Sequence, residues 1–349
     1  MPGDVEIETG RIAAVGCQPA GAGGLAVPGF VDLQVNGFGG VDFLTADPGA
    51  YAAAGDALAA TGVTAFQPTL ISAPPAALRT ALAVASEARC PLRVLGVHLE
   101  GPFLSPAWPG AHQPEHLRAP DPALLDELLA AGSVAAMTLA PVLPGGLDLI
   151  EALAGRRVGA RIGHTDADAA TAGAAFERGA AAITHIHNAH RRFAPRDPGP
   201  AGAALARDGV AVTAIVDGVH LAPETVESVR RAAGARLCVV SDAIAAAGCG
   251  DGTFSLGSAG VEVRDGRATR PDGTLAGSTG GLDRALRLLD EGGAPLAGAV
   301  HAVSRAPALL AGRPDLGRLA RGAPADVVVL DDELRVTRTV AGGVELYAE

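Results

Sequence analysis

Short apolar runs rich in β-branched residues alternate with alanine- and leucine-rich stretches between about residue 30 and residue 310. Runs of this length predict buried strands, and the stretches between them are long enough for helical crossovers. Pro122–Ala131 and Asp168–Arg178 are two of the predicted helices. The predicted strands are Phe30–Asn36, Thr64–Leu70, Val94–Glu100, Met137–Val142, Val158–His164, Ala181–His187, Val210–Val216 and Leu237–Asp242.

The alternation of strands and helices predicts an α/β fold. Eight βα units over roughly 250 residues are typical of a TIM-type (β/α)8 barrel, and an open doubly wound sheet is the alternative. The two ends differ from this pattern, because Asp4–Val15 and Asp326–Leu346 alternate apolar and polar residues around glycine-containing turns. Such segments predict β-hairpins. We therefore expect a barrel over residues 29–317 and a small β-sandwich-like domain built from residues 1–28 and 318–349.

The net charge and the hydropathy of the chain limit the kinds of molecule that the protein can be expected to bind. The formal net charge of −11 disfavours nucleic acid and anionic membrane surfaces. No apolar run approaches the roughly 18 residues of a membrane-spanning helix, and no signal segment opens the chain. A cytoplasmic protein is therefore expected. The four cysteines form no CxxC pair, which argues against a disulfide framework or a cysteine-bound zinc.

The chain contains no lysine, so arginine supplies all of its basic side chains. This absence excludes several kinds of chemistry. A binuclear metal centre bridged by a carboxylated lysine cannot form, and neither can a Schiff base or a P-loop of the usual type. An anionic small molecule remains possible, because local arginines can hold a phosphate inside an acidic protein.

Polar side chains recur where the predicted strands end. In a (β/α)8 barrel the catalytic groups lie at the carboxyl ends of the strands. A single histidine is more often a satisfied core or surface residue, but most of the nine histidines fall at or just after these ends. Their recurrence on one face predicts a metal site. The strand-end residues are Gln34, Asn36, His98, Glu100, His164, His185, His187 and Asp242, and His220 follows the seventh strand.

Glu100, His164 and His185 form a candidate ligand set from strands three, five and six. Zinc and related metals take imidazole nitrogen and carboxylate oxygen, and a catalytic site keeps three protein ligands and one open position. Each of the three residues has a glycine or a small polar neighbour, which permits close approach of metal and substrate. The alternative for Glu100 is a buried carboxylate paired with an arginine.

Asp242, at the end of strand eight, is placed to serve as general base and acid toward a metal-activated water. Its alternative interpretation is an N-cap of the next helix. His112 lies on the loop after strand three, where it could donate a hydrogen bond to a carbonyl oxygen that becomes negative.

Arg196 and His220 are candidates for holding a phosphate. Arg196 lies in the basic loop 191–199 that follows strand six, and an arginine fork beside a histidine suits a phosphate group. Taken alone, however, a basic loop is more often a solvated surface.

Seven blocks together resemble the N-acetylglucosamine-6-phosphate deacetylases, which are part of the amidohydrolase superfamily. They occur in the order of that family and span nearly the whole chain from residue 28, so the set is specific although single blocks are not. The blocks are Pro28–Gly37 (PGFVDLQVNG), His98–Phe103 (HLEGPF), Gly163–Thr165 (GHT), Thr184–Ala189 (THIHNA), Asp217–His220 (DGVH), Ser241–Ala243 (SDA) and Leu275–Ser278 (LAGS).

The resemblance implies a metal-dependent hydrolase that deacetylates N-acetylglucosamine 6-phosphate. It implies Glu100, His164 and His185 as ligands, Asp242 as base and acid, and His112 at the acetyl carbonyl. Gln34-Val35-Asn36 stands where many amidohydrolases have a His-x-His pair, which favours one divalent metal ion per subunit. Zinc is expected, and iron, cobalt or manganese would also fit such ligands.

The resemblance also implies a homodimer and the contacts of the sugar. His220 and Arg196 would hold the phosphate, with Arg196 reaching in from the partner subunit. The residues expected to line the sugar site are Gln34, Asn188 and Ala189.

Two residues depart from the family pattern. His190 stands where methionine is usual, and His187 where an aromatic residue is common. These changes concern sugar specificity and metal stoichiometry more than the reaction. Three alternatives therefore stay open: the same reaction on N-acetylgalactosamine 6-phosphate, a related deaminase or cyclic amidase, and a binding protein that has lost turnover.

Overall fold

The computed structural model describes residues 3–16 and 23–349. Within these ranges, eight parallel strands pair with one another in chain order. A short strand, β8 (Arg93–Val94), also pairs with β7. The eight strands are β4 (Phe30–Val35), β7 (Val63–Ile71), β9 (Val97–Glu100), β10 (Val134–Leu139), β11 (Gly159–Ile162), β12 (Ala182–Ile183), β13 (Ala211–Ile215) and β14 (Leu237–Val240).

The last strand returns to the first, so the sheet closes on itself. The amide of Asp242 donates to the carbonyl of Gln34 at 2.9 Å, and the amide of Asn36 donates to the carbonyl of Ala243 at 2.7 Å. An open doubly wound sheet has no such contact between its edges. The predicted barrel is therefore confirmed, and the alternative is wrong.

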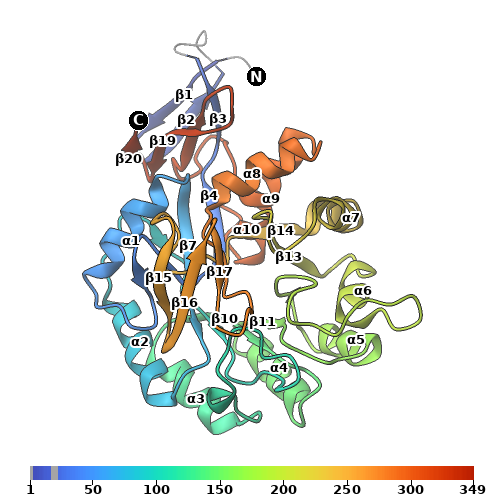
Figure 1. Ribbon diagram of the computed structural model, residues 1–349. Helices are drawn as coiled ribbons and strands as arrows, with labels where there is room; N and C mark the ends of the chain where they lie inside the picture. Colours follow the sequence, from blue (N-terminus) through green and yellow to red (C-terminus); the bar gives the residue numbers. More distant parts are fainter. Residues whose placement is uncertain (1–2, 17–22) are drawn as a thin grey trace.

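Helices cover the outside of the barrel strands (Figure 1). Their starts follow from local chemistry: Asp121 caps α3 by accepting from the amides of Ala123 and Leu124, and Pro122 occupies its first turn. Asp168 caps α5 in the same way. The helices are α1 (Ala50–Ala59), α2 (Pro75–Glu87), α3 (Pro122–Ala131), α4 (Gly146–Gly155), α5 (Ala169–Glu177), α6 (Gly199–Leu205), α7 (Pro223–Ala233), α8 (Leu282–Glu291), α9 (Leu296–Val303) and α10 (Arg305–Leu310), with short 3₁₀ turns at Pro114–His116 and Gly234–Arg236.

Both ends of the chain build antiparallel sheets beside the barrel (Figure 1). This confirms a small β domain assembled from both termini. Its bounds at residues 28 and 318 stay a prediction, and residues 1–2 and 17–22 lie outside the described part of the chain. A hairpin joins β1 (Val5–Glu8) to β2 (Arg11–Val15), and a four-stranded sheet has the order β20 (Val344–Ala348), β19 (Val336–Ala341), β18 (Val327–Leu330) and β3 (Leu25–Pro28).

A three-stranded antiparallel sheet that was not predicted is inserted between β14 and α8. It consists of β15 (Gly252–Leu256), β16 (Ala259–Arg264) and β17 (Arg267–Thr269). Alternate residues of β16 are buried, and this apolar face packs against Ile71 and Ile244 near the ends of barrel strands. The insertion therefore lies over the carboxyl ends of the barrel. Two further short strands, β5 (Gly37–Phe38) and β6 (Val41–Asp42), form a small ribbon after β4.

Across residues 3–16 and 23–349, every helix is too short or too polar to cross a membrane.

Candidate active site

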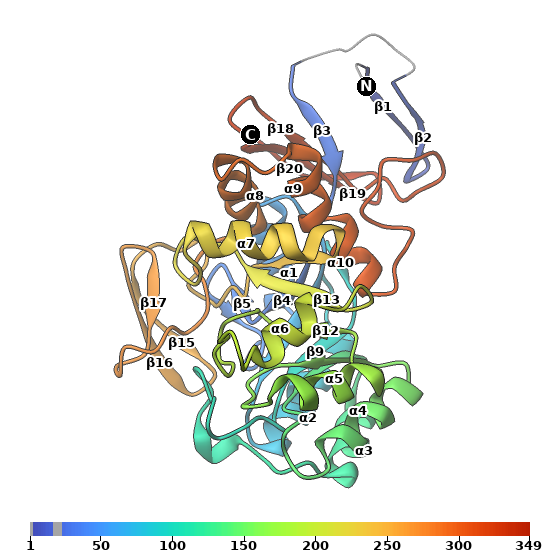
Figure 2. The same ribbon diagram turned by 90° about the vertical axis from the view of Figure 1, so that its right-hand side faces the viewer.

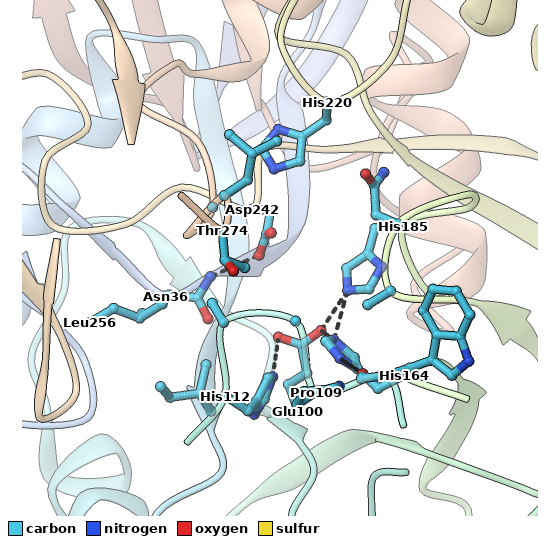
Figure 3. A pocket seen from close by; sticks show the side chains of 18 of the residues that line it. Asn36, Glu100, Pro109, His112, His164, His185, His220, Asp242, Leu256 and Thr274 are labelled. Atoms are coloured by element: carbon cyan, nitrogen blue, oxygen red, sulfur yellow. Dashed lines mark hydrogen bonds and ion pairs between the residues drawn. The ribbon is translucent and has the colours of Figure 1, made fainter. Parts of the chain in front are cut away.

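A cavity of about 300 Å³ opens at the carboxyl ends of the barrel strands (Figure 3). It brings together eight of the ten residues to which the sequence analysis assigned a role in catalysis, metal binding or substrate binding. Gln34 and Arg196 do not line it. The selected residues that do are Glu100, His112, His164, His185, Asn188, Ala189, His220 and Asp242, and other lining residues include Asn36, Trp108, Leu256 and Thr274.

Glu100, His164 and His185 converge at the bottom of this cavity, and all three are buried. The Nε2 atoms of His164 and His185 lie 3.3 and 2.8 Å from Oε1 of Glu100, and 3.2 Å from each other. Ligands at about 2.0–2.1 Å from a tetrahedral zinc are separated by about 3.3 Å. One carboxylate oxygen and two imidazole nitrogens thus have both the chemistry and the spacing to bind one divalent cation.

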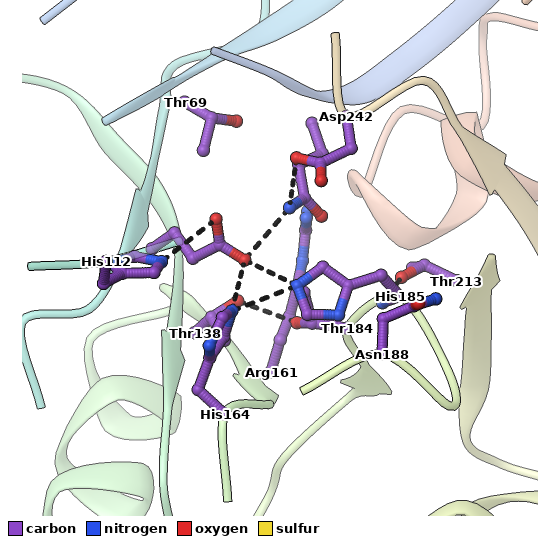
Figure 4. Close-up of polar contacts among 12 residues, drawn as sticks. Thr69, His112, Thr138, Arg161, His164, Thr184, His185, Asn188, Thr213 and Asp242 are labelled. Carbon is purple, nitrogen blue, oxygen red and sulfur yellow. Dashed lines mark hydrogen bonds and ion pairs between the residues drawn. The ribbon is translucent and has the colours of Figure 1, made fainter. Parts of the chain in front are cut away.

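His112 approaches the other oxygen of the same carboxylate (Figure 4). Its Nε2 lies 3.6 Å from Oε2 of Glu100, and ligand atoms of Glu100, His112 and His164 lie within 4.8 Å of one another. We favour the set with His185 because its distances are shorter and the Nε2 atoms of both histidines face the same carboxylate oxygen, Oε1. The Nδ1 of His112 accepts from the backbone amide of Ser72 at 3.1 Å, so Nε2 carries the ring proton. His112 can therefore donate a hydrogen bond from Nε2.

The ring of His164 is oriented from behind by Trp108. Its Nδ1 donates to the carbonyl of Trp108 at 3.0 Å, which leaves the Nε2 lone pair free to face a cation. A Cβ added to Gly110 would lie 2.9 Å from Cε1 of His164, so the loop can pass this close only with glycine there. Trp108 was not predicted as a site residue, because it acts through its backbone carbonyl, a group that every residue carries. The one sequence feature that could have indicated it is that it is the sole tryptophan of the chain and precedes Pro109-Gly110.

Three of these side chains stand on unusual backbone. The φ angles of His164, His185 and Asp242 are 46°, 30° and 50°, in the left-handed region that residues with a Cβ seldom adopt. The chain turns sharply there, which ends β11, β12 and β14 just before the polar residue and aims its side chain into the cavity. Strain of this kind persists only where the surrounding structure holds it, and it is common at functional sites.

Asp242 is not the N-cap of a helix, because residues 243–248 form turns and a bridge. Its Oδ1 accepts hydrogen bonds from Asn36 at 2.8 Å and from Gln34 at 2.9 Å. Burial, together with the nearby charge of Glu100, raises the pKa of Asp242 to about 6. A carboxyl group with such a pKa can accept a proton and return it near neutral pH.

The protonation states of the candidate ligands also bear on cation binding. Burial disfavours the charge of Glu100, but hydrogen bonds from His112 and His185, together with the charge of His185, hold its pKa well below the usual range. Burial lowers the pKa of His164, so its ring is neutral. Burial acts in the same direction on His185, but Glu100 outweighs it and raises the pKa. Across the described residues no arginine pairs with Glu100, so that alternative is not observed.

Gln34 is fully buried beneath the cavity. Its Nε2 donates to Oε1 of Glu100 at 3.0 Å and to Oδ1 of Asp242 at 2.9 Å. A single amide thus joins the candidate base to the candidate metal set. Gln34 does not line the cavity, and its expected contact with a sugar stays a prediction.

His220 lies at the opposite side of the cavity from His112 (Figure 3). Its Nδ1 donates to Oδ2 of Asp217 at 2.8 Å, so Nε2 is the ring nitrogen left for a ligand. Burial opposes the charge of Asp217, but the hydrogen bond with His220 lowers its pKa to about 2. This ionised carboxylate orients the ring.

Arg196 is exposed on the loop after β12, away from the cavity of its own chain. The loop is well held: Ala194 and Asp197 exchange backbone hydrogen bonds, and the carboxylate of Asp197 accepts from Arg191 at 2.7 Å. Phe193 beside it is 53% exposed. Arg196 makes no hydrogen bond or ion pair within the described ranges.

The two residues that depart from the family pattern are outside the cavity lining. His190 is buried, and its Nε2 donates to the carbonyl of Thr184 at 2.7 Å, directly behind His185. His187 is half-buried, and burial lowers its pKa. Neither residue therefore reshapes the cavity directly.

Residues 25–346 match the profile of the amidohydrolase family. The chain belongs to this family. The resemblance to N-acetylglucosamine-6-phosphate deacetylases is also confirmed: the enzymes of that name from Rattus norvegicus and Homo sapiens are each 38% identical over 341 residues, which cover 92% of this chain and 83% of theirs. An N-acetylgalactosamine-6-phosphate deacetylase from Escherichia coli O157:H7 is 34% identical over 321 residues, covering 89% of this chain and 85% of its own.

Solved structures of this amidohydrolase's relatives agree with the fold. An N-acetyl-D-glucosamine-6-phosphate deacetylase mutant from Mycobacterium smegmatis, in complex with N-acetyl-D-glucosamine-6-phosphate, superposes with a TM-score of 0.92 at 36% identity, covering 99% of this chain and 94% of that one. The Thermotoga maritima enzyme gives 0.89 at 32% identity, covering 99% and 95%. The chain is thus an amidohydrolase with a cluster that can hold a metal ion.

Proposed function

We propose that this amidohydrolase removes the acetyl group from N-acetylglucosamine 6-phosphate, giving acetate and glucosamine 6-phosphate. One observation carries the proposal: Gln34 joins Asp242, a carboxyl group with a raised pKa, to a buried cluster whose spacing fits one cation. The names of the similar enzymes, and the ligand in the Mycobacterium smegmatis complex, support this substrate.

Glu100, His164 and His185 would hold one divalent ion, and zinc suits two imidazoles and a carboxylate. Iron, cobalt or manganese would fit the same donors. The bound ion would act as a Lewis acid toward the amide carbonyl and lower the pKa of a water molecule. The absence of lysine supports one ion rather than a lysine-bridged pair.

The chain's own residues then move the protons. Asp242 accepts a proton from the water that attacks the carbonyl carbon, and returns it to the sugar nitrogen as the C–N bond breaks. The water oxygen leaves in acetate, and the nitrogen leaves as an amine. The Nε2–H of His112 stabilises the carbonyl oxygen as it gains negative charge, because Ser72 holds the ring in the donating form.

Recognition of the sugar phosphate involves a second copy of the chain. Within the described residues no arginine lines the cavity, although a phosphate dianion calls for one. Arg196 is exposed on a firmly held loop and has no partner of its own there, so we propose that it reaches the cavity of the other subunit in a homodimer. His220 would hold the phosphate beside it, and Asn188, Ala189 and Gln34 would position the sugar. The expected cytoplasmic location stays a prediction.

The test is an acetate-release assay on the purified protein, with metal analysis of the same sample. N-acetylglucosamine 6-phosphate should be hydrolysed, and Asp242→Asn should not release acetate above a small residual rate. Faster turnover of N-acetylgalactosamine 6-phosphate would shift the substrate to the one named for the Escherichia coli relative. Ammonia without acetate would indicate a deaminase, and ligand binding without any product would indicate a protein that has lost turnover.

A further inference from the structure

A second cavity, of about 330 Å³, lies at the amino-terminal end of the barrel. It is formed by the first residues of β10 and β11 and by the end of α10. Figure 2 shows α10 on the side of the molecule away from β15–β17, which cover the active site. The cavity is therefore separate from the proposed active site. Its lining includes Gln67, Ala136, Arg157, Gly159, Arg161 and Leu310.

Arg161 is the buried cation of this cavity, with only 2% of its surface exposed. Its guanidinium donates to the carbonyl of Leu33 at 3.1 Å and to Oε1 of Gln67 at 2.6 Å, and both acceptors are neutral. No carboxylate among the described residues forms an ion pair with it. Burial lowers the pKa of Arg161 to about 10. The negative charge of Glu100 favours the charged form of Arg161, but no carboxylate contacts the guanidinium among the described residues, and an anion beside it would offset more of the cost of burial.

Arg157 adds a second positive charge at the mouth of the cavity. It is exposed and has a φ of 58°, and its guanidinium makes no hydrogen bond or ion pair in the part of the chain that the structure describes. Its neighbour Arg156 differs, because it pairs with Asp126. No acidic side chain of the described residues lines the cavity. Two arginines thus line one cavity of a protein whose net charge is −11.

We propose that this cavity binds a small oxyanion, such as inorganic phosphate or the phosphate group of a small ester. Arg161 would be the inner donor and Arg157 the outer one. A guanidinium presents five N–H groups in one plane, and Leu33 and Gln67 each engage one of them, so other donors remain for a ligand. The cavity is large enough for a tetrahedral oxyanion, and Gly159 leaves room beside the strand.

The first test is equilibrium dialysis of the metal-loaded, full-length protein against labelled inorganic phosphate. Because the active site can also bind phosphate, we expect two sites per chain. Arg157→Ala should weaken one of them about tenfold or more, the loss expected for one charge-assisted hydrogen bond. Arg161→Gln should abolish that site. Arg156→Ala removes a neighbouring surface charge outside the lining and should leave both sites unchanged.

Phosphate binding that is the same in Arg157→Ala, Arg156→Ala and the unaltered protein would overturn the proposal. A second measurement covers the case in which Arg161→Gln fails to fold. Crystals of the unaltered protein soaked in tungstate should show density between Arg157 and Arg161, and tungstate bound at the active site alone would refute the site. Neither result depends on whether the chain hydrolyses an amino sugar phosphate.

Discussion

The side-chain amide of Gln34 donates to Oδ1 of Asp242 at 2.9 Å, across the seam where the first and last barrel strands meet. The same nitrogen lies 3.0 Å from Glu100. The separation between the proposed base and the proposed metal set is therefore fixed by one buried side chain.

Replacing Gln34 by leucine should lower kcat about 10- to 100-fold, the range seen when a residue that orients metal-site groups is removed. Leucine keeps the volume but donates no hydrogen bond, so Asp242 would be oriented by Asn36 alone. Steady-state kinetics, with a thermal melt and metal analysis of the same sample, would measure this. An unchanged kcat in a folded, metal-loaded variant would mean that Gln34 is only a packing residue.

Asp242→Asn should lower kcat by about 10²–10⁴-fold, because an amide of the same shape cannot accept the proton from water. Substrate affinity should change little, since the variant adds no bulk. Single-turnover acetate release and substrate binding by calorimetry would separate the two effects. A loss smaller than tenfold would show that another group acts as the base.

The rate should fall as the pH drops through about 6 and below. Burial and Glu100 raise the pKa of Asp242 to about 6, and its protonated form cannot act as a base. A bound cation favours the ionised carboxylate, so the midpoint lies at or below this value. A kcat/KM profile would show the acid limb, and the residual activity of Asp242→Asn should lack it. An acid limb that persists in this variant would assign the titration to a different group.

Arg196→Ala should raise KM strongly for the phosphorylated substrate, whereas Arg192→Ala, an exposed arginine of the same loop, should not. If Arg196 acts on the neighbouring subunit, mixing Arg196→Ala with Asp242→Asn should restore activity. In a mixed dimer, the Asp242→Asn chain donates its Arg196 to a site that keeps Asp242. Failure of exchanged, verified heterodimers to recover activity would place Arg196 outside the partner's site.

Removal of the metal by a chelator should abolish activity and lower the melting temperature, and zinc should restore both. A ligand that binds only the folded chain stabilises it by about 4 kcal/mol at a thousandfold excess over Kd. Glu100→Gln should lose most of the zinc-dependent shift, because the anionic ligand is gone. Differential scanning calorimetry would test this, and a full zinc shift in Glu100→Gln would contradict the proposed ligand set.

Sequence periodicity predicted the barrel well but placed the strand ends less accurately. Ala181–His187 was predicted as one strand, whereas β12 covers only Ala182–Ile183. The chain leaves the ladder at His185 because its backbone turns into the left-handed region there. No local propensity of a histidine indicates that turn, which the surrounding structure imposes.

The inserted sheet β15–β17 escaped prediction for a different reason. Its burial depends on residues far away in the sequence, such as Ile71, and a local pattern does not show them. The cluster at Glu100 could be predicted because side-chain type and strand-end position coincide. Two other features depend on three-dimensional contacts that the residue types do not indicate. These are the hydrogen bond from His164 to the carbonyl of Trp108 and the burial of Arg161 among neutral acceptors.

The barrel closes between Val35 and Ala243, so a newly made chain can complete its proposed active site only after residue 243 has been synthesised. During synthesis, Glu100, His164 and His185 all leave the ribosome before Asp242. A nascent chain that ends near residue 230 thus carries the whole proposed ligand set but lacks its proton carrier. Strand β4 must wait, with one edge unpaired, for some two hundred further residues. Until then the unpaired edge is a site where partly made chains can aggregate.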